Sequence, residues 1–277
     1  MIEIKVNSNY FNIKDTLECG QIFRFHPYDK GYKVYSKDKC AYLYNDQDNV
    51  IIKTNESDAE YFQNFFDVKR DYSLIVESAI NSGVAILEKS AQIGKGIRIL
   101  NQDKIEVLFS FVVSQNNNIP RIKGIIEKLC SQLGEKKEFD GQSYFAFPTV
   151  QKMASMPLEF YQSIGLGYRA KYIKTLAQEI ANGLDLNYFD RLSTKQLKRQ
   201  LTALYGVGPK VADCVSLFGY HRSDSFPVDT WIDKVYKQDF KGTLTDRNKI
   251  SDWFVNEFSI NAGYFQQYLF YYKRSKE

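Results

Sequence analysis

Apolar and polar residues alternate along much of the first third of the chain. Five short runs rich in Ile, Val, Tyr and Phe show this pattern, at residues 2–6, 21–25, 32–36, 41–45 and 49–53. Turn-forming sequences separate several of them, such as PYDKG at 27–31 and NDQDN at 45–49. A period of two residues between such turns is typical of antiparallel strands. The pattern therefore predicts an N-terminal antiparallel β-sheet.

From about residue 72 the apolar residues recur at spacings of three and four, which is typical of amphipathic helices. The segments with this spacing are 71–91, 104–115, 119–133, 168–183, 194–204, 209–218, 229–237 and 263–274. Gly, Pro and Asn fall at the breaks between them, as they do at helix ends. We predict an α+β fold, with a β-rich domain at 1–95 and a mostly helical part at 96–277.

Composition adds broad limits to this outline. The chain has 277 residues, of which 44% are hydrophobic and 25% are charged. These values are ordinary for a globular protein of roughly two domains. The net charge of +4 permits a polyanionic partner without requiring one. No apolar run has transmembrane length and the start MIEIKVNSNY does not resemble a signal peptide, so we expect no membrane partner and a cytoplasmic protein, nucleoid-associated in a bacterium or archaeon.

The side chains that commonly bind metals are scattered along the sequence. The cysteines form no CxxC pair and the two histidines are far apart; these residues are Cys19, Cys40, Cys130, Cys214, His26 and His221. This spacing argues against a zinc site, a redox pair, an iron–sulfur cluster and histidine-based metal catalysis. We therefore expect chemistry without a metal and without another cofactor.

The stretch LYGVGPKVADCV at 204–215 predicts the turn of a helix–hairpin–helix at about 194–218. Gly206, Val207 and Gly208 make a tight turn, and Pro209 suits the first position of the second helix. Backbone N–H groups in such a turn, beside a helix N-terminus, can bind a DNA phosphate without reading the base sequence. The alternative for this segment alone is an ordinary corner between two helices, without a ligand.

Lys210 stands in the first turn of the second helix, where the helix dipole disfavours a cation. A neutral lysine can act as a nucleophile, whereas the alternative is a solvated surface lysine. Cys214 lies one turn further on the same face and either lines a pocket or belongs to the core. Asp229 is placed to cap the next helix, and its fixed carboxylate could stabilise positive charge near Lys210. An amine with a fixed carboxylate suits attack on a sugar C1′.

The pattern GVGPKVADC followed by PVD resembles the signature of helix–hairpin–helix DNA glycosylases that use a lysine nucleophile. Within that superfamily the chain most closely resembles the 8-oxoguanine DNA glycosylase/lyases. The shared motifs follow the family order across nearly the whole chain. They are CGQIFRF at 19–25, SQNNNIPRIKGIIEKLC at 114–130, IGLGYRAKY at 164–172, the hairpin with its aspartate, and GYFQQYLF at 263–270.

The resemblance implies a bifunctional enzyme of base excision repair that acts on duplex DNA containing 8-oxoguanine. Lys210 would attack C1′ and form a Schiff base, and Asp229 would stabilise the cationic sugar. β-Elimination would then nick the strand. Cytosine would be preferred opposite the lesion, and we expect the protein to be a monomer.

The resemblance also implies a pocket that recognises the extruded base. The backbone carbonyl of Gly20 would accept a hydrogen bond from N7–H, which oxidised guanine carries and normal guanine lacks. Gln266 would read the Watson–Crick edge. Phe270 would stack on one face of the base and Cys214 on the other. The spacing of four between Gln266 and Phe270 independently supports a shared helical face.

Four further residues would hold the rest of the DNA. Asn116 would fill the space left in the duplex, and Tyr168 would wedge into the base stack. Arg121 and Arg169 would hold the orphaned cytosine. Without the resemblance, these segments read as ordinary loops and helix starts with solvated side chains.

Three positions depart from the family pattern. Trp231 stands where better-known members have a histidine, which puts a contact to the lesion's phosphate in doubt. Cys19 and Ile22 replace small hydroxyl residues around Gly20. No cysteine follows Cys214, so the four-cysteine cluster of relatives that excise adenine or oxidised pyrimidines is not expected. Two alternatives remain: a glycosylase for another damaged base, and a non-catalytic DNA-binding helix–hairpin–helix module.

Overall fold

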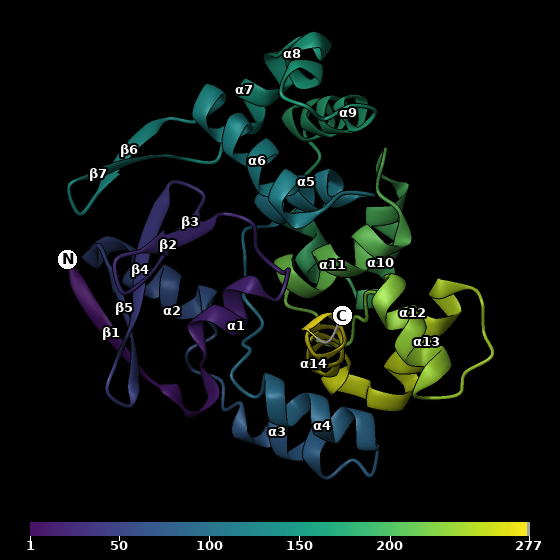
Figure 1. Cartoon of the computed structure of the whole chain (residues 1–277). Coiled ribbons are helices and arrows are strands. Elements are labelled where there is room, and N and C mark those ends of the chain that lie inside the picture. The colour runs from purple at the N-terminus through teal and green to yellow at the C-terminus, as the bar shows by residue number, and fades with distance from the viewer. Residues whose placement is uncertain (276–277) are drawn as a thin grey trace.

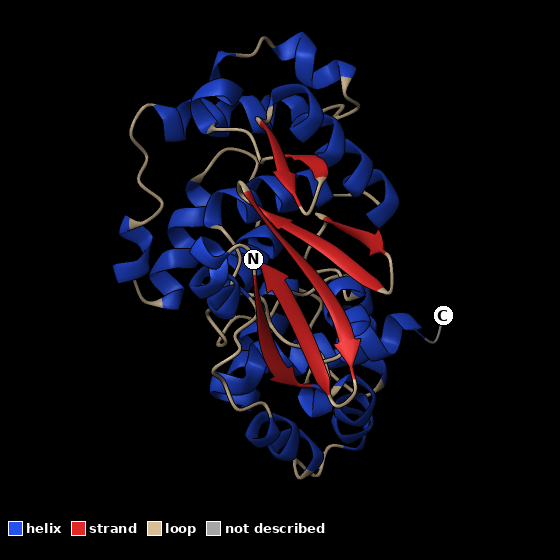
Figure 2. Ribbon diagram, turned by 90° about the vertical axis from the view of Figure 1, so that its left-hand side faces the viewer, coloured by secondary structure: helices blue, strands red, loops and turns tan. Residues whose placement is uncertain are grey.

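Five strands near the N-terminus form one antiparallel sheet in the computed structural model, which describes residues 1–275 (Figures 1 and 2). The strands are β1 (Ile2–Asn7), β2 (Phe25–Tyr28), β3 (Gly31–Ser36), β4 (Lys39–Asp46) and β5 (Asn49–Thr54), in the order β1-β5-β4-β3-β2. Val34, Leu43 and Ile52 are fully buried on its inner face. Two helices, α1 (Ile13–Glu18) and α2 (Ala59–Phe65), contribute to the same apolar cluster. The predicted sheet is therefore confirmed.

The strand predicted at 21–25 is wrong except for its last residue, since β2 begins at Phe25. Gln21 is fully buried, and its amide donates to the carbonyls of Thr16 at 2.9 Å and Arg98 at 2.8 Å. Its side-chain oxygen accepts from the N–H of Leu100 at 2.9 Å. These bonds tie Gln21 to α1 and to residues 98–100, so residues 21–23 lie outside the sheet, while the carbonyl of Arg24 accepts from the N–H of Tyr35 in β3 at 3.0 Å.

The remaining chain is mostly helical. Its helices are α3 (Ser73–Ile80), α4 (Ala85–Gly94), α5 (Lys104–Ser114), α6 (Ile119–Leu133), α7 (Val150–Ser155), α8 (Leu158–Ser163), α9 (Arg169–Ala181), α10 (Thr194–Ala203), α11 (Pro209–Gly219), α12 (Thr230–Gln238), α13 (Arg247–Phe258) and α14 (Ala262–Ser275). A small hairpin of β6 (Lys136–Phe139) and β7 (Gln142–Phe145) interrupts them. The segment predicted at 71–91 forms two helices, and the helices at 150–155, 158–163 and 247–258 were not predicted. The predicted α+β class is confirmed.

Helix α14 runs through the centre of the molecule, where Figure 1 shows it almost end-on. It packs against α4 and α12, and a single large apolar cluster joins it to α3, α5, α6, α9 and α11. The sheet has a separate cluster of its own. Helices α3 and α4 thus share their core with the helical part, although they precede residue 96. The domain division at 95/96 stays a prediction.

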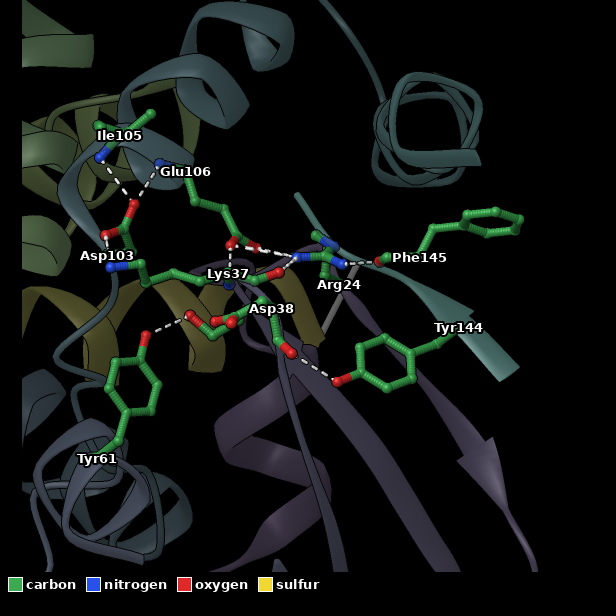
Figure 3. Close-up of polar contacts among 10 residues, drawn as sticks. Arg24, Lys37, Asp38, Tyr61, Asp103, Ile105, Glu106, Tyr144 and Phe145 are labelled. Atoms are coloured by element: carbon green, nitrogen blue, oxygen red, sulfur yellow. Dashed lines mark hydrogen bonds and ion pairs between the residues drawn. The ribbon is translucent and has the colours of Figure 1, made fainter. Parts of the chain in front are cut away.

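A buried ion pair joins the sheet to α5 (Figure 3). The Arg24 guanidinium lies 3.3 Å from the carboxylate of Glu106 and donates to the carbonyl of Phe145 at 2.5 Å. Glu106 also accepts from the N–H of Lys37 at 2.8 Å. Arg24 and Glu106 are 7% and 6% exposed. Because a buried charge that loses its partner is strongly destabilising, this network fixes the sheet and the β6–β7 hairpin against the helical part.

Candidate active site

The predicted helix–hairpin–helix is formed by α10 and α11. The hydroxyl of Ser193 caps α10 in a capping box with Gln196. Gly206 has φ of +82°, and a Cβ there would lie 2.3 Å from Cγ of Tyr172, so both conformation and space require glycine. Gly208 caps α11 with φ of −85° and has open space around it. The turn therefore leaves room for a ligand at Gly208.

Only part of the predicted phosphate cradle is open in the free protein. Val207 is buried, and its N–H donates to the carbonyl of Leu204 at 3.1 Å. Gly206 and Gly208 donate no such bond within the part of the chain that the structure describes. The side-chain amide of Gln115 donates to the carbonyl of Gly206 at 2.9 Å, which fixes the turn from the α5 side. Gly206 and Gly208 are thus the N–H groups available to an anion.

Lys210 and Cys214 lie one turn apart on α11, as predicted. Lys210 is half-buried, and its Nζ lies 5.5 Å from the ring centroid of Phe111. Cys214 is buried, and burial raises the pKa of its thiol to about 11, with the nearby Lys210 opposing this rise. The thiol is therefore protonated at neutral pH and offers the cavity a neutral, polarisable wall.

Asp229 caps α12, as its position in the sequence predicts. Its Oδ1 accepts from the N–H groups of Trp231 and Ile232, both at 2.9 Å. Within residues 1–275 its Oδ2 accepts no hydrogen bond. The cap holds the carboxylate in one orientation while one oxygen stays free to act on a neighbouring charge.

The six residues assigned to chemistry and base recognition line one small cavity of about 50 Å³. They are Gly20, Lys210, Cys214, Asp229, Gln266 and Phe270. The cavity shares several of its walls with a groove of about 640 Å³. Sequence reasoning missed Phe111, Phe218 and Gln267, which line the same cavity. Both phenylalanines stand in strongly apolar helical runs, where nothing distinguishes them from core residues.

Gln266 presents an unused acceptor to this cavity. The residue is 4% exposed, and its amide donates to the carbonyl of Pro227 at 3.2 Å. Its buried Oε1 has no partner among the described residues. A buried polar atom without a partner is unfavourable unless a ligand satisfies it.

Gly20 also lines the cavity. Its φ is +90°, and a Cβ would lie 3.4 Å from Cε1 of Phe270 and 3.2 Å from Nη1 of Arg274. The positive φ therefore favours glycine, which also lets the backbone itself approach whatever occupies the cavity.

The four residues assigned to the rest of the DNA lie together beside the groove. Asn116 is exposed, and its side-chain amide lies 3.3 Å from the hydroxyl of Tyr168, which is 52% exposed. Arg121 is exposed as well. Arg169 is buried and donates to the carbonyls of Gln115 at 2.7 Å and Asn116 at 2.9 Å. Asn116 lines the groove itself.

Two further cations line the groove and were not identified from the sequence. Arg247 is the first residue of α13, and Arg274 stands near the end of α14. With Lys210 they make the groove basic, which suits a polyanion. Arg247 stands in a helix of mixed charge and Arg274 in the basic last turn of α14, where an arginine usually indicates only a solvated face or a helix end.

Two further properties bear on the kind of site. Across residues 1–275 the side chains of His, Cys, Asp and Glu form no cluster of three or more that could hold a metal ion. Among the same residues no helix combines the length and the hydrophobicity that a bilayer crossing needs.

Comparison with known proteins identifies the families and relatives that this chain resembles. The model of the 8-oxoguanine DNA glycosylase N-terminal domain matches residues 3–108, and that of the HhH-GPD superfamily base excision DNA repair proteins matches residues 109–251. An N-glycosylase/DNA lyase of Saccharomyces cerevisiae is 30% identical over 269 residues, covering 86% of this chain and 71% of its own. A probable N-glycosylase/DNA lyase of Methanothermobacter thermautotrophicus is 28% identical over 247 residues, covering 82% and 77%.

A solved structure shows the same fold over nearly the whole chain. The 8-oxoguanine glycosylase/lyase of Clostridium acetobutylicum, in complex with double-stranded DNA containing cytosine opposite 8-oxoguanine, superimposes with a TM-score of 0.91. The two sequences are 36% identical, and the match covers 97% of this chain and 93% of that one.

Proposed function

The chain belongs to the 8-oxoguanine DNA glycosylase/lyases of the HhH-GPD superfamily of base excision repair proteins, and on this premise we propose that it excises 8-oxoguanine through a Schiff base on Lys210 and then nicks the strand. We propose cytosine as the preferred opposite base. The observation that supports the proposal is that Lys210, Asp229, Gly20 and Gln266 line one cavity, because an amine suited to attack and polar groups suited to base recognition then face the same space.

Recognition requires the base to leave the duplex, at a cost of a few kcal/mol. In the cavity, the Gly20 carbonyl accepts from N7–H, and Gln266 binds the Watson–Crick edge with its unused Oε1 and its amide. Phe270 and the protonated thiol of Cys214 contact the two faces of the ring. Since the free cavity measures only about 50 Å³, entry of a purine requires its walls to move apart. Phe270 is half-buried and is one wall that can move.

Chemistry begins when the neutral amine of Lys210 attacks C1′. The electron pair of the C1′–N9 bond leaves with the base, and the carboxylate of Asp229 stabilises the positive charge that develops on the sugar. The amine passes a proton to the departing base. The C1′–O4′ bond then breaks, O4′ takes a proton from solvent, and the nitrogen lone pair forms the protonated Schiff base. Loss of a proton from C2′ then expels the 3′ phosphate, which breaks the strand by β-elimination.

The DNA outside the cavity is held by the groove and by the hairpin. The N–H groups of Gly206 and Gly208 bind a phosphate, with Val207 buried behind them. Asn116 fills the space left by the extruded base, and Tyr168 wedges into the stack beside it.

Arg121 and Arg169 bind the orphaned cytosine. Arg121 is already exposed. Arg169 bonds to the carbonyls of Gln115 and Asn116 in the free protein, so loop 115–116 rearranges when DNA binds. The opposite-base preference thus depends on a change in this loop. We expect the protein to act as a monomer.

Excision assays on matched duplexes test this proposal. Single-turnover assays compare 8-oxoguanine with other oxidised and alkylated bases, each opposite cytosine. The proposal expects release of 8-oxoguanine to be much the fastest. Faster release of another lesion would assign the site to that base, and binding to all duplexes without any release would leave a non-catalytic DNA-binding module.

A further inference from the structure

The turn that carries Gly20 presents four successive backbone carbonyls near the cavity, at residues 18–21. The carbonyl of Glu18 accepts from Nη2 of Arg274, and that of Cys19 accepts from the side-chain amide of Gln267 at 3.2 Å. The carbonyl of Gln21 accepts from the side-chain amide of Gln102 at 2.8 Å. Across residues 1–275 the carbonyl of Gly20 accepts no hydrogen bond. The carbonyl left free thus belongs to Gly20, which lines the cavity.

Two of these donors stand on a single face of α14. Gln267 and Arg274 are seven residues apart, which is close to two helical turns, and Phe270 lies between them on the same face. The Arg274 guanidinium lies 5.2 Å from the Phe270 ring centroid, beside Gly20. Gln267 is 2% exposed, so its amide is a buried donor. This face of α14 therefore seats the turn through side-chain hydrogen bonds.

Gly20 needs such a support because glycine permits several backbone conformations. Rotation of the peptide unit between Gly20 and Gln21 would put the N–H of Gln21 in the place of the Gly20 carbonyl. An N–H suits the bare N7 acceptor of normal guanine, whereas a carbonyl suits the N7–H of 8-oxoguanine. Bonds to the carbonyls on both sides of Gly20 oppose this rotation.

We propose that Gln267 and Arg274 are positioning residues, which hold the turn so that the enzyme meets the base with the Gly20 carbonyl. The inference rests on the proposed function, since it explains how that function discriminates damaged from normal guanine. Neither side chain needs to touch the base for this role. Both act through the carbonyls of Glu18 and Cys19.

The test uses Gln267→Leu and Arg274→Met in the full chain. Two quantities are measured: the ratio of affinities for 8-oxoguanine and guanine duplexes, and strand nicking at a preformed abasic site. We expect each variant to lower the ratio on the order of tenfold, since each loses a hydrogen bond. In Gln267→Leu, nicking at the abasic site should fall much less than the ratio does, because that substrate has no base to read. Arg274 also lines the DNA groove, so Arg274→Met is judged by the affinity ratio alone, in which a general loss of DNA binding cancels.

Matched variants separate positioning from a loss of packing. Gln63→Leu makes the same substitution in α2, away from the cavity, and should keep the wild-type ratio. Arg274→Lys keeps a cationic donor and should recover much of what Arg274→Met loses. Gln267→Glu has the shape of glutamine, but its ionised carboxylate repels the Cys19 carbonyl. Its ratio should rise as the pH falls and the carboxyl becomes a donor.

Several results would overturn the inference while leaving the proposed function intact. They are a wild-type affinity ratio in Gln267→Leu and Arg274→Met, an equal loss of the affinity ratio and of abasic-site nicking in Gln267→Leu, or a pH-independent ratio in Gln267→Glu. Failure of the wild-type protein itself to release 8-oxoguanine would instead refute the proposed function. If Gln267→Leu does not fold, the affinity ratios of Arg274→Lys and Gln267→Glu still test the inference.

Discussion

Replacing Asp229 with asparagine separates its charge from its role as a helix cap. In the structure Oδ1 accepts both capping hydrogen bonds, and the amide oxygen of asparagine can accept the same two. Asparagine and aspartate cap helices about equally well. The main change is therefore the loss of a negative charge in the cavity that Asp229 shares with Lys210.

The expected effect on rate follows from the size of the site. A carboxylate about 5 Å from the cationic sugar, at an effective dielectric constant of about 20, stabilises it by about 3 kcal/mol. Loss of that stabilisation slows base release roughly 150-fold. The melting temperature of Asp229→Asn should fall by no more than about 2 °C, because only the interaction with the helix dipole weakens.

The assay is single-turnover release of 8-oxoguanine with the enzyme in excess, together with calorimetric melting and DNA affinity. Asp229→Ala serves as the comparison, because it loses the charge and the cap and should melt about 2 °C lower again. Its rate should match that of Asp229→Asn. A near-normal rate in Asp229→Asn combined with weaker DNA binding would refute the electrostatic role and leave only the cap.

Three further predictions concern α11 and its turn. Gly206→Ala should destabilise the fold by about 2 kcal/mol or more in urea unfolding, because its Cβ would lie 2.3 Å from Tyr172 and its φ is positive. Gly208→Ala, by contrast, should unfold normally but bind duplex DNA more weakly. Burial raises the pKa of Asp213 from 3.8 to about 6, so wild type should lose up to about 3 kcal/mol of stability as the pH rises from 4 to 7, and Asp213→Asn should lack this slope in unfolding curves. A flat difference between the two proteins would contradict that ionisation. Cys214, with a pKa of about 11, should resist iodoacetamide at pH 8, and rapid alkylation followed by mass spectrometry would show a more reactive thiol.

Local signals in the sequence predicted much of the fold. The helix predicted at 119–133 has those bounds in the structure, because Asn118 caps it and the helix ends before Gly134. The turn of the helix–hairpin–helix could be predicted equally well, since its glycines and proline determine its conformation. The segment at 21–25 was misread because Gln21, a polar residue in an alternating run, is buried and bonded to backbone far along the chain.

The site likewise contains residues that the sequence predicts and contacts that it does not. Lys210 and Asp229 could be chosen from local spacing and from the resemblance, because their positions relative to helix starts are visible in the sequence. The hydrogen bond from the Gln267 amide to the carbonyl of Cys19, beside Gly20, could not be predicted, because 248 residues of sequence separate the two. Likewise, nothing in the sequence shows that Arg169 bonds to loop 115–116 in the free protein. Contacts of this kind depend on how the helices pack.

The central claim is that Lys210 forms a covalent bond with the sugar that carries the damaged base. Borohydride reduction during reaction with a duplex containing one 8-oxoguanine opposite cytosine traps such a bond. We predict a protein–DNA adduct for wild type and none for Lys210→Gln, although both bind the duplex. An equal adduct in Lys210→Gln, or tight binding by wild type without any adduct, would contradict the assignment of Lys210 as the nucleophile.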